Sequence, residues 1–144
     1  MTEKALAISN NDYLVWDNLA GYYKWLDQKP KVEQVRAKML PMVEDKVASD
    51  PRDATAHAVL ANIYAEQGLK EKSLTRNLAA ESLAGDDPQI LQMIADAYEK
   101  LGDRKAALGY SKRALQKGAT LDSLTSDPDL QALLKDPAFR GPAK

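Results

Sequence analysis

The sequence has no cysteine among its 144 residues and a single histidine, His57. The absence of cysteine excludes disulfide bonds, thiolate metal sites and cysteine nucleophiles. A lone histidine lacks the further ligands that a metal normally needs, and a catalytic histidine needs a nucleophile or carboxylate within reach. We therefore interpret His57 as a packing residue and expect no metal site and no cofactor.

Charge of one sign and long apolar runs are also missing. Twenty basic residues against 21 acidic ones give a net charge of -1, so no overall positive field attracts nucleic acid or anionic lipid. No run reaches the roughly 18 apolar residues of a membrane-spanning helix. The first residues include Glu3, Asn10 and Asp12, unlike a signal peptide. These absences predict a cytoplasmic protein without nucleic-acid or membrane partners.

Catalytic motifs are absent as well. There is no phosphate-binding glycine-rich loop, no G-x-S-x-G elbow and no H-E-x-x-H motif. Two acid pairs, Asp86 with Asp87 and Asp127 with Asp129, stand at expected helix starts, where carboxylates accept hydrogen bonds from free backbone N–H groups. We interpret them as caps and expect no enzymatic activity.

An internal repeat is the clearest positive feature of the chain. A frame around Tyr64 recurs 34 positions later around Tyr98. Within it, Ala61, Tyr64, Gly68, Leu74 and Ala80 match Ala95, Tyr98, Gly102, Leu108 and Ala114. Part of the frame also occurs earlier, as Trp16, Leu19, Ala20 and Tyr23. A period of this length is typical of helix–turn–helix units that bury their apolar faces against one another.

The order Trp16-x2-Leu19-Ala20-x2-Tyr23 resembles the opening of a tetratricopeptide repeat (TPR). The resemblance implies an all-α fold, a right-handed superhelix of antiparallel helix pairs with small residues at the helix contacts and tyrosines between units. In this family the stacked pairs leave a concave surface that holds another protein. A non-catalytic protein-binding scaffold is therefore the expected function.

Residues typical of helix starts and ends stand where the repeat predicts them. We expect helices near 12–27, 31–48, 53–67, 70–84, 87–101 and 103–117. The expected N-caps are Asp53, Asp87 and Asp103, and the expected left-handed C-caps are Gly68, Gly85, Gly102 and Gly118. Asp27 stands where the later copies have glycine, which predicts a different turn there. Pro41 lies inside the second helix and predicts a kink or a break.

We expect one domain over residues 1–144. Residues 1–10 resemble the tail of a preceding repeat helix, 11–50 form a first repeat with an extended second helix, 51–85 a second repeat and 86–118 a third. Residues 119–144 resemble the tail that closes many bacterial TPR arrays, and this tail is expected to cap the apolar end of the array with a short helix. Most of its contact is expected from Leu130, Leu133, Leu134 and Phe139.

In this family the first helix of each repeat lines the groove. The residues predicted to bind a partner there are Asp17, Lys24, Trp25, Asn62, Glu66, Gln92, Asp96 and Glu99. Acids outnumber bases in the aligned groove, which favours a neutral or basic polypeptide, and Asn62 is expected to bond to its backbone. The acids also oppose clamping of a chaperone's terminal carboxylate. Trp25 is either an anchor for the partner or a packing residue.

The expected function is thus protein–protein interaction within a larger bacterial regulatory protein. Two alternatives remain open at this point. The chain could be a self-association module that forms a homodimer through its exposed N-terminal face. It could also be the auxiliary domain of an enzyme such as a kinase or a nucleotide cyclase.

Overall fold

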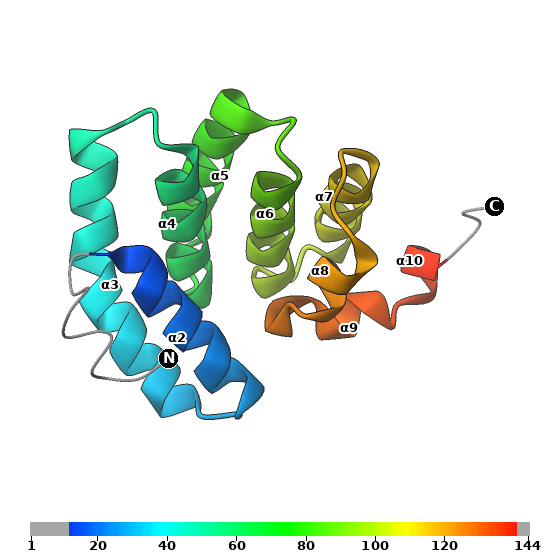
Figure 1. The fold of residues 1–144 in the computed structure, drawn as a ribbon, viewed down its shortest axis with the longest axis horizontal. Helices are drawn as coiled ribbons and strands as arrows, with labels where there is room; N and C mark the ends of the chain where they lie inside the picture. The colour runs from blue at the N-terminus through cyan, green and yellow to red at the C-terminus, as the bar shows by residue number, and fades with distance from the viewer. Residues whose placement is uncertain (1–11, 141–144) are drawn as a thin grey trace.

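A computed structural model describes residues 12–140, so the stub predicted over residues 1–10 lies outside the described residues. This part of the chain is all-α and contains no strand (Figure 1). Its helices are α2 (Tyr13–Trp25), α3 (Lys29–Ser49), α4 (Ala54–Glu66), α5 (Lys70–Ala84), α6 (Pro88–Lys100), α7 (Arg104–Gln116), α8 (Leu121–Thr125), the 3-10 helix η1 (Pro128–Leu130), α9 (Gln131–Leu134) and α10 (Pro137–Arg140). The first six pack as antiparallel pairs α2·α3, α4·α5 and α6·α7. None of the described helices is long and apolar enough to cross a membrane.

Three aspartates begin the helices where the sequence predicts them. Asp53 accepts a hydrogen bond from the backbone N–H of Ala56 at 3.0 Å, and Asp103 accepts one from Ala106 at 3.1 Å. Asp87 caps α6 in the same way, with a proline at the first helical position. The predicted N-caps are confirmed, and each satisfies a donor that the helix itself leaves free.

The turns within the pairs use the left-handed backbone region. Gly68 and Gly102 have φ angles of 76° and 82°, as predicted. Asp27 adopts φ 55° at the equivalent place, so the prediction of a different turn is wrong. The following residue bonds back to the carbonyl of Tyr23 at 2.9 Å, the same contact that Leu69 makes to Tyr64. Aspartate tolerates this region better than most residues because its short polar side chain is accommodated there.

The turns between pairs are less uniform. Gly118 has φ 117° after α7, as predicted. Gly85 has φ −66° after α5, so its predicted left-handed cap is wrong. Here the chain leaves the helix in the right-handed region, and the backbone N–H of Asp87 closes the turn on the carbonyl of Ala84 at 3.0 Å. A glycine at the end of a helix allows the left-handed cap without requiring it.

Helix α3 has 21 residues, against 15 in α5 and 13 in α7. Pro41 lies inside it and does not break it. The two halves of the helix run in different directions in Figure 1, in keeping with the kink expected at an internal proline.

Alanines allow the helices to approach closely. Ala20, Ala61, Ala80, Ala95 and Ala114 have no exposed surface, as their repeated positions predict. The repeated tyrosines differ from one another. Tyr64 is buried, whereas Tyr98 is half-buried and stacks on Tyr110 with ring centroids 5.4 Å apart.

The C-terminal segment turns back onto the last pair. Leu130 and Leu133 are fully buried against Ala95 and Ala107, as predicted, while Leu134 and Phe139 pack as partly buried neighbours. Leu124 is also fully buried, although the sequence pattern did not predict it. The segment then reaches α2, so η1 contacts both α6 and the first described helix (Figure 1).

Candidate functional site

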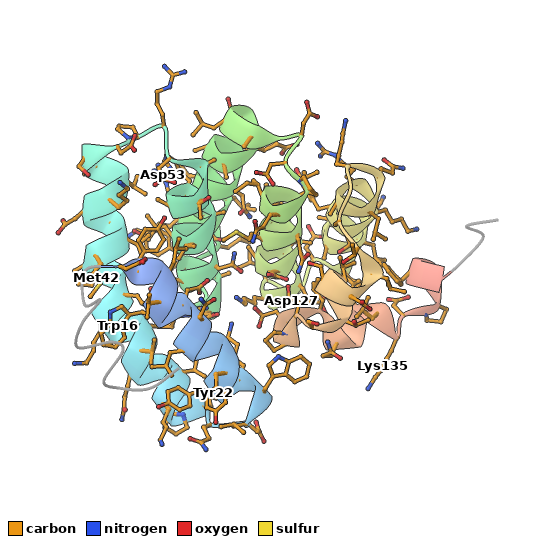
Figure 2. All side chains as sticks on the ribbon, in the orientation of Figure 1. Trp16, Tyr22, Met42, Asp53, Asp127 and Lys135 are labelled. Atoms are coloured by element: carbon orange, nitrogen blue, oxygen red, sulfur yellow. The ribbon has the colours of Figure 1, made fainter. Side chains whose placement is uncertain are left out.

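The first helix of each antiparallel pair, α2, α4 or α6, faces a common side of the molecule, which we call the inner face. Residues 123–129, from the last turn of α8 into η1, lie across it and form what we call the returning segment. Figure 2 shows Asp127 on this segment beside α6, and Tyr22 towards the C-terminal end of α2. The inner face is therefore built from three helices and a returning piece of the chain.

A buried set of charges occupies its centre, and we call it the ion cluster: Lys24, Arg36, Glu66, Lys100 and Asp129. Glu66 lies 2.7 Å from the ammonium groups of both lysines. Asp129 lies 3.0 Å from Lys24 and 3.1 Å from Lys100. The two carboxylates and the two ammonium groups thus alternate around one point, joining α2, α4, α6 and η1.

Arg36 enters the cluster from α3, the long second helix. Its guanidinium donates to Glu66 through Nε at 2.7 Å and through Nη2 at 3.0 Å, and to Asp17 through Nη1 at 2.7 Å. Such a two-pronged contact suits the planar guanidinium. The arginine therefore fixes Glu66 and connects α3 with both α2 and α4.

The cluster shifts the ionisation of its members. Burial alone would raise the pKa of Glu66, but Lys100, Arg36 and Lys24 together hold it well below its usual range. Burial would lower the pKa of Lys100, yet Asp129 and Glu66 raise it. Both groups therefore stay charged over the whole physiological pH range.

Asn62 lies at the edge of the cluster and is fully engaged there. Its amide nitrogen donates to the carbonyls of Ala58 and Met93, each at 2.9 Å, and its oxygen accepts from Lys100 at 2.8 Å. The structure thus places Asn62 as a tie between α4 and α6. The amide has no free donor in this state for the backbone of a partner.

Asp96 and Asp127 form an acidic pair next to the ion cluster. Asp96 is 9% exposed, and its Oδ1 has no hydrogen-bond partner. Burial, and then the hydrogen bond and the charge of Asp127, raise the pKa of Asp96 well above its usual value. One oxygen each from Asp96, Asp127 and Asp129 lie within 4.8 Å of one another, the spacing at which carboxylates can hold a cation.

Two other predicted residues contact the returning segment itself. The indole Nε1 of Trp25 donates to the carbonyl of Ser126 at 3.2 Å. The amide of Gln92 donates to the carbonyl of Ser123 at 3.2 Å and to Asp127 at 3.1 Å. Trp25 therefore packs beside the tail of its own chain, and half of its surface stays exposed.

Of the residues predicted to bind a partner, Glu99 alone contacts neither the ion cluster nor the returning segment. Its carboxylate binds the guanidinium of Arg104 at 2.6 Å, and Arg104 also binds Asp136 at 2.8 Å. This second ion pair network fastens the tail to the start of α7. It shares no member with the ion cluster.

Two hollows open beside the ion cluster. The first, of about 340 Å³, lies between α2, α6 and the returning segment, with Tyr22, Trp25, Asp96 and Asp127 on its wall. The second, of about 710 Å³, lies between the start of α3 and the end of α4. Both volumes fall in the range of ligand sites or of side-chain pockets at interfaces.

Some members of the site were missed from the sequence. Arg36 stands on a second helix, where the family pattern predicts no groove residue, but it interrupts an otherwise apolar buried stripe of Val32, Val35, Met39 and Val43. A charge in such a stripe indicates a buried ion pair. Asp129 was interpreted as a cap and instead belongs to the ion cluster, whereas Asp127 does cap η1.

His57 packs as the sequence predicts. Its Nε2 lies 2.8 Å from the carbonyl of Pro51, and its Nδ1 lies 3.2 Å from the guanidinium of Arg76. The ring is buried and bridges the start of α4 to α5.

Comparison of the chain with protein-family models and with curated proteins gives no match.

Proposed function

We propose that this chain is a non-catalytic interaction module of the TPR type, a right-handed superhelix whose inner face binds a polypeptide. The observation that carries the proposal is the returning segment. Trp25 and Gln92, both predicted to contact a partner, donate to backbone carbonyls of this segment, Trp25 to Ser126 just after α8 and Gln92 to Ser123 within α8. A face that recognises peptide carbonyls in this way is suited to a second polypeptide alongside the first.

Burial of the tail decides how a partner would reach this face. Leu124, Leu130 and Leu133 are fully buried, and exposing each costs roughly 1.5–3 kcal/mol. Displacing the whole tail would therefore cost most of the stability of a small domain. The partner accordingly binds in the hollows that the tail leaves open and uses the tail as part of the wall. As an interaction module, the chain would serve within a larger bacterial regulatory protein.

A photo-crosslinking experiment tests the proposal. One variant carries a benzophenone amino acid in place of Tyr22, which is 51% exposed on the wall of the smaller hollow. A matched variant carries it in place of Leu78, which is 64% exposed on the second helix α5. A partner that crosslinks from position 22 and not from position 78 supports binding at the inner face. Crosslinks from position 78 alone would place the partner on the outer helices and contradict the proposal.

One observation favours self-association as a second candidate. Leu14, Tyr22 and Trp25 expose large apolar side chains on α2, the first described helix, and Leu26 exposes another directly after it. Exposed apolar patches on helices commonly mark interfaces. Light scattering between micromolar and millimolar chain distinguishes the two candidates. A mass that doubles with concentration, and that Leu14→Ser returns to that of the monomer, would favour a homodimer.

A further inference from the structure

The charges of the inner face do not balance. Within the ion cluster and its extension to Asp17, three cations from Lys24, Arg36 and Lys100 face three carboxylates. These six groups neutralise one another. Asp96 and Asp127 are additional acids, and no basic side chain is paired with either of them in the described part of the chain.

The cation next to this acid pair, Lys100, cannot neutralise Asp96 and Asp127. The ammonium group of Lys100 attracts Asp96 electrostatically, but it already contacts the amide oxygen of Asn62 at 2.8 Å, Glu66 at 2.7 Å and Asp129 at 3.1 Å. An ammonium group has three protons to donate. Asp127 receives hydrogen bonds from neutral donors, the amide of Gln92, the backbone N–H of Asp129 and the protonated carboxyl of Asp96.

The uncompensated acids stand at the wall of the smaller hollow. Asp96 is nine-tenths buried and its Oδ1 is unpartnered, which is costly for a carboxyl group unless a cation or a donor arrives. Tyr22 and Trp25 line the same hollow, each with about half of its surface exposed. Aromatic faces attract cations and pack well against aliphatic stems.

We propose that the hollow of about 340 Å³ between α2, α6 and the returning segment receives a basic side chain, lysine or arginine, of the bound polypeptide. The cationic head binds Asp96 and Asp127, and its stem lies against Trp25 and Tyr22. This inference rests on the proposed function and assigns the chemistry of the partner. The sequence predicts a neutral or basic partner, and the inference assigns a binding site for its positive charge, the pair Asp96 and Asp127.

A basic side chain fits better than a metal ion. A calcium ion takes six to eight oxygen ligands, and only three carboxylates converge here. Asp129, the third of them, already binds two ammonium groups and is therefore not free to coordinate a metal ion. The hollow is also larger than a single ion requires, and its volume suits a side chain with four or more heavy atoms.

The test follows the indole N–H signals of the isotopically labelled full chain by NMR. The probes are three blocked peptides in which glycine alternates with lysine, glutamine or glutamate, and calcium chloride serves as a fourth. The signal of Trp25 reports the hollow, and that of Trp16, on the same helix, is the internal control. Variants are Asp96→Asn and Asp127→Asn, with Asp45→Asn as a matched loss of one exposed acid from α3.

We expect the lysine peptide to shift the Trp25 signal at a lower concentration than the glutamine peptide. Each of Asp96→Asn and Asp127→Asn should weaken its binding about tenfold, and Asp45→Asn should leave it unchanged. An unchanged backbone spectrum shows that each variant is folded. Added salt should weaken binding to the wild type more than to the two site variants.

Four results would overturn the inference. Equal shifts with lysine and glutamine peptides would show a groove without charge preference, and the proposed function would stand. Preference for the glutamate peptide would reverse the charge assignment. A calcium-dependent shift abolished by Asp96→Asn would identify a metal site instead. No shift with any probe would exclude a basic side-chain pocket, while crosslinking from position 22 would still decide the proposed function separately.

Discussion

Lys24 and Asp129 are 105 residues apart in the sequence, and their charged groups lie 3.0 Å apart in the structure. The contact joins the first described helix to the tail across the inner face. Both side chains are largely buried, with 15% and 17% of their surface exposed. The tail therefore closes the apolar end of the array and also completes a polar wall that the repeats alone do not have.

Glu66→Gln should destabilise the protein by about 3–5 kcal/mol, because it removes the negative charge that three buried cations share. A urea titration at pH 7 measures the free energy of unfolding. The matched control is Glu33→Gln on the exposed side of α3, which should change it by less than about 0.5 kcal/mol. Equal effects of the two changes would contradict the central role of Glu66.

The same carboxylate gives the stability of the protein an acidic limit. The pKa of Glu66 lies far below 4.5 in the folded chain, so its contribution is present above 4.5. It is lost as the pH falls from 4.5 towards the folded pKa, since protonation then favours the unfolded chain. The Glu66→Gln variant should lose less stability than the wild type between pH 5 and pH 2, measured by thermal unfolding.

Asp96→Asn should stabilise the protein at neutral pH by about 1 kcal/mol, since it replaces an uncompensated buried acid with a neutral group that can donate to Asp127. The pKa of Asp96 is raised, so its favourable contribution is present below 3.8 and is lost as the pH rises through the folded pKa. The gain should therefore disappear in acid. A variant less stable than the wild type at pH 7 would show that Asp96 is compensated.

Leu133→Ala should lower the free energy of unfolding by about 2–5 kcal/mol, because the side chain is fully buried against the last helix pair. The control is Leu121→Ala in the same tail, where the leucine is 56% exposed and the expected cost is below about 1 kcal/mol. If the two variants unfold at the same urea concentration, the tail is a passive extension and not part of the core.

Tyr64→Ala should cost about 3–5 kcal/mol, as expected for a large buried aromatic side chain whose hydroxyl also donates to Glu44 at 2.7 Å. Tyr98→Ala should cost less, because Tyr98 is half-buried and its main aromatic contact is Tyr110. Chemical denaturation of both variants measures the difference. A larger cost at Tyr98 would contradict the deeper burial of Tyr64.

Local features of the fold could be predicted from the sequence. Helix starts depend on a residue and its near neighbours, so Asp53, Asp87 and Asp103 identify themselves as caps. The left-handed turn at Asp27 could not be predicted in the same way, since a hydrogen bond to the carbonyl of Tyr23 decides its conformation over the weak preference of the residue. Gly85 could not be predicted either, because glycine allows both left-handed and right-handed turns and the structure has the right-handed one.

The candidate site was only partly predictable for a similar reason. The resemblance to the family assigns Lys24, Glu66 and Asp96, on the first helices of three successive pairs, to a common face, and the structure does bring them together. The resemblance does not say which charges neutralise each other. That depends on Arg36 from a second helix and on Asp129 from the tail, two residues whose positions follow from tertiary packing alone.

Hydrogen exchange of the full chain, with and without the partner captured at position 22, tests the central claim most directly. Binding at the inner face predicts slower exchange in the C-terminal half of α2, in α6 and in residues 123–129, with α5 and α7 unchanged. Protection confined to α5 and α7, with none on the inner face, would contradict the account.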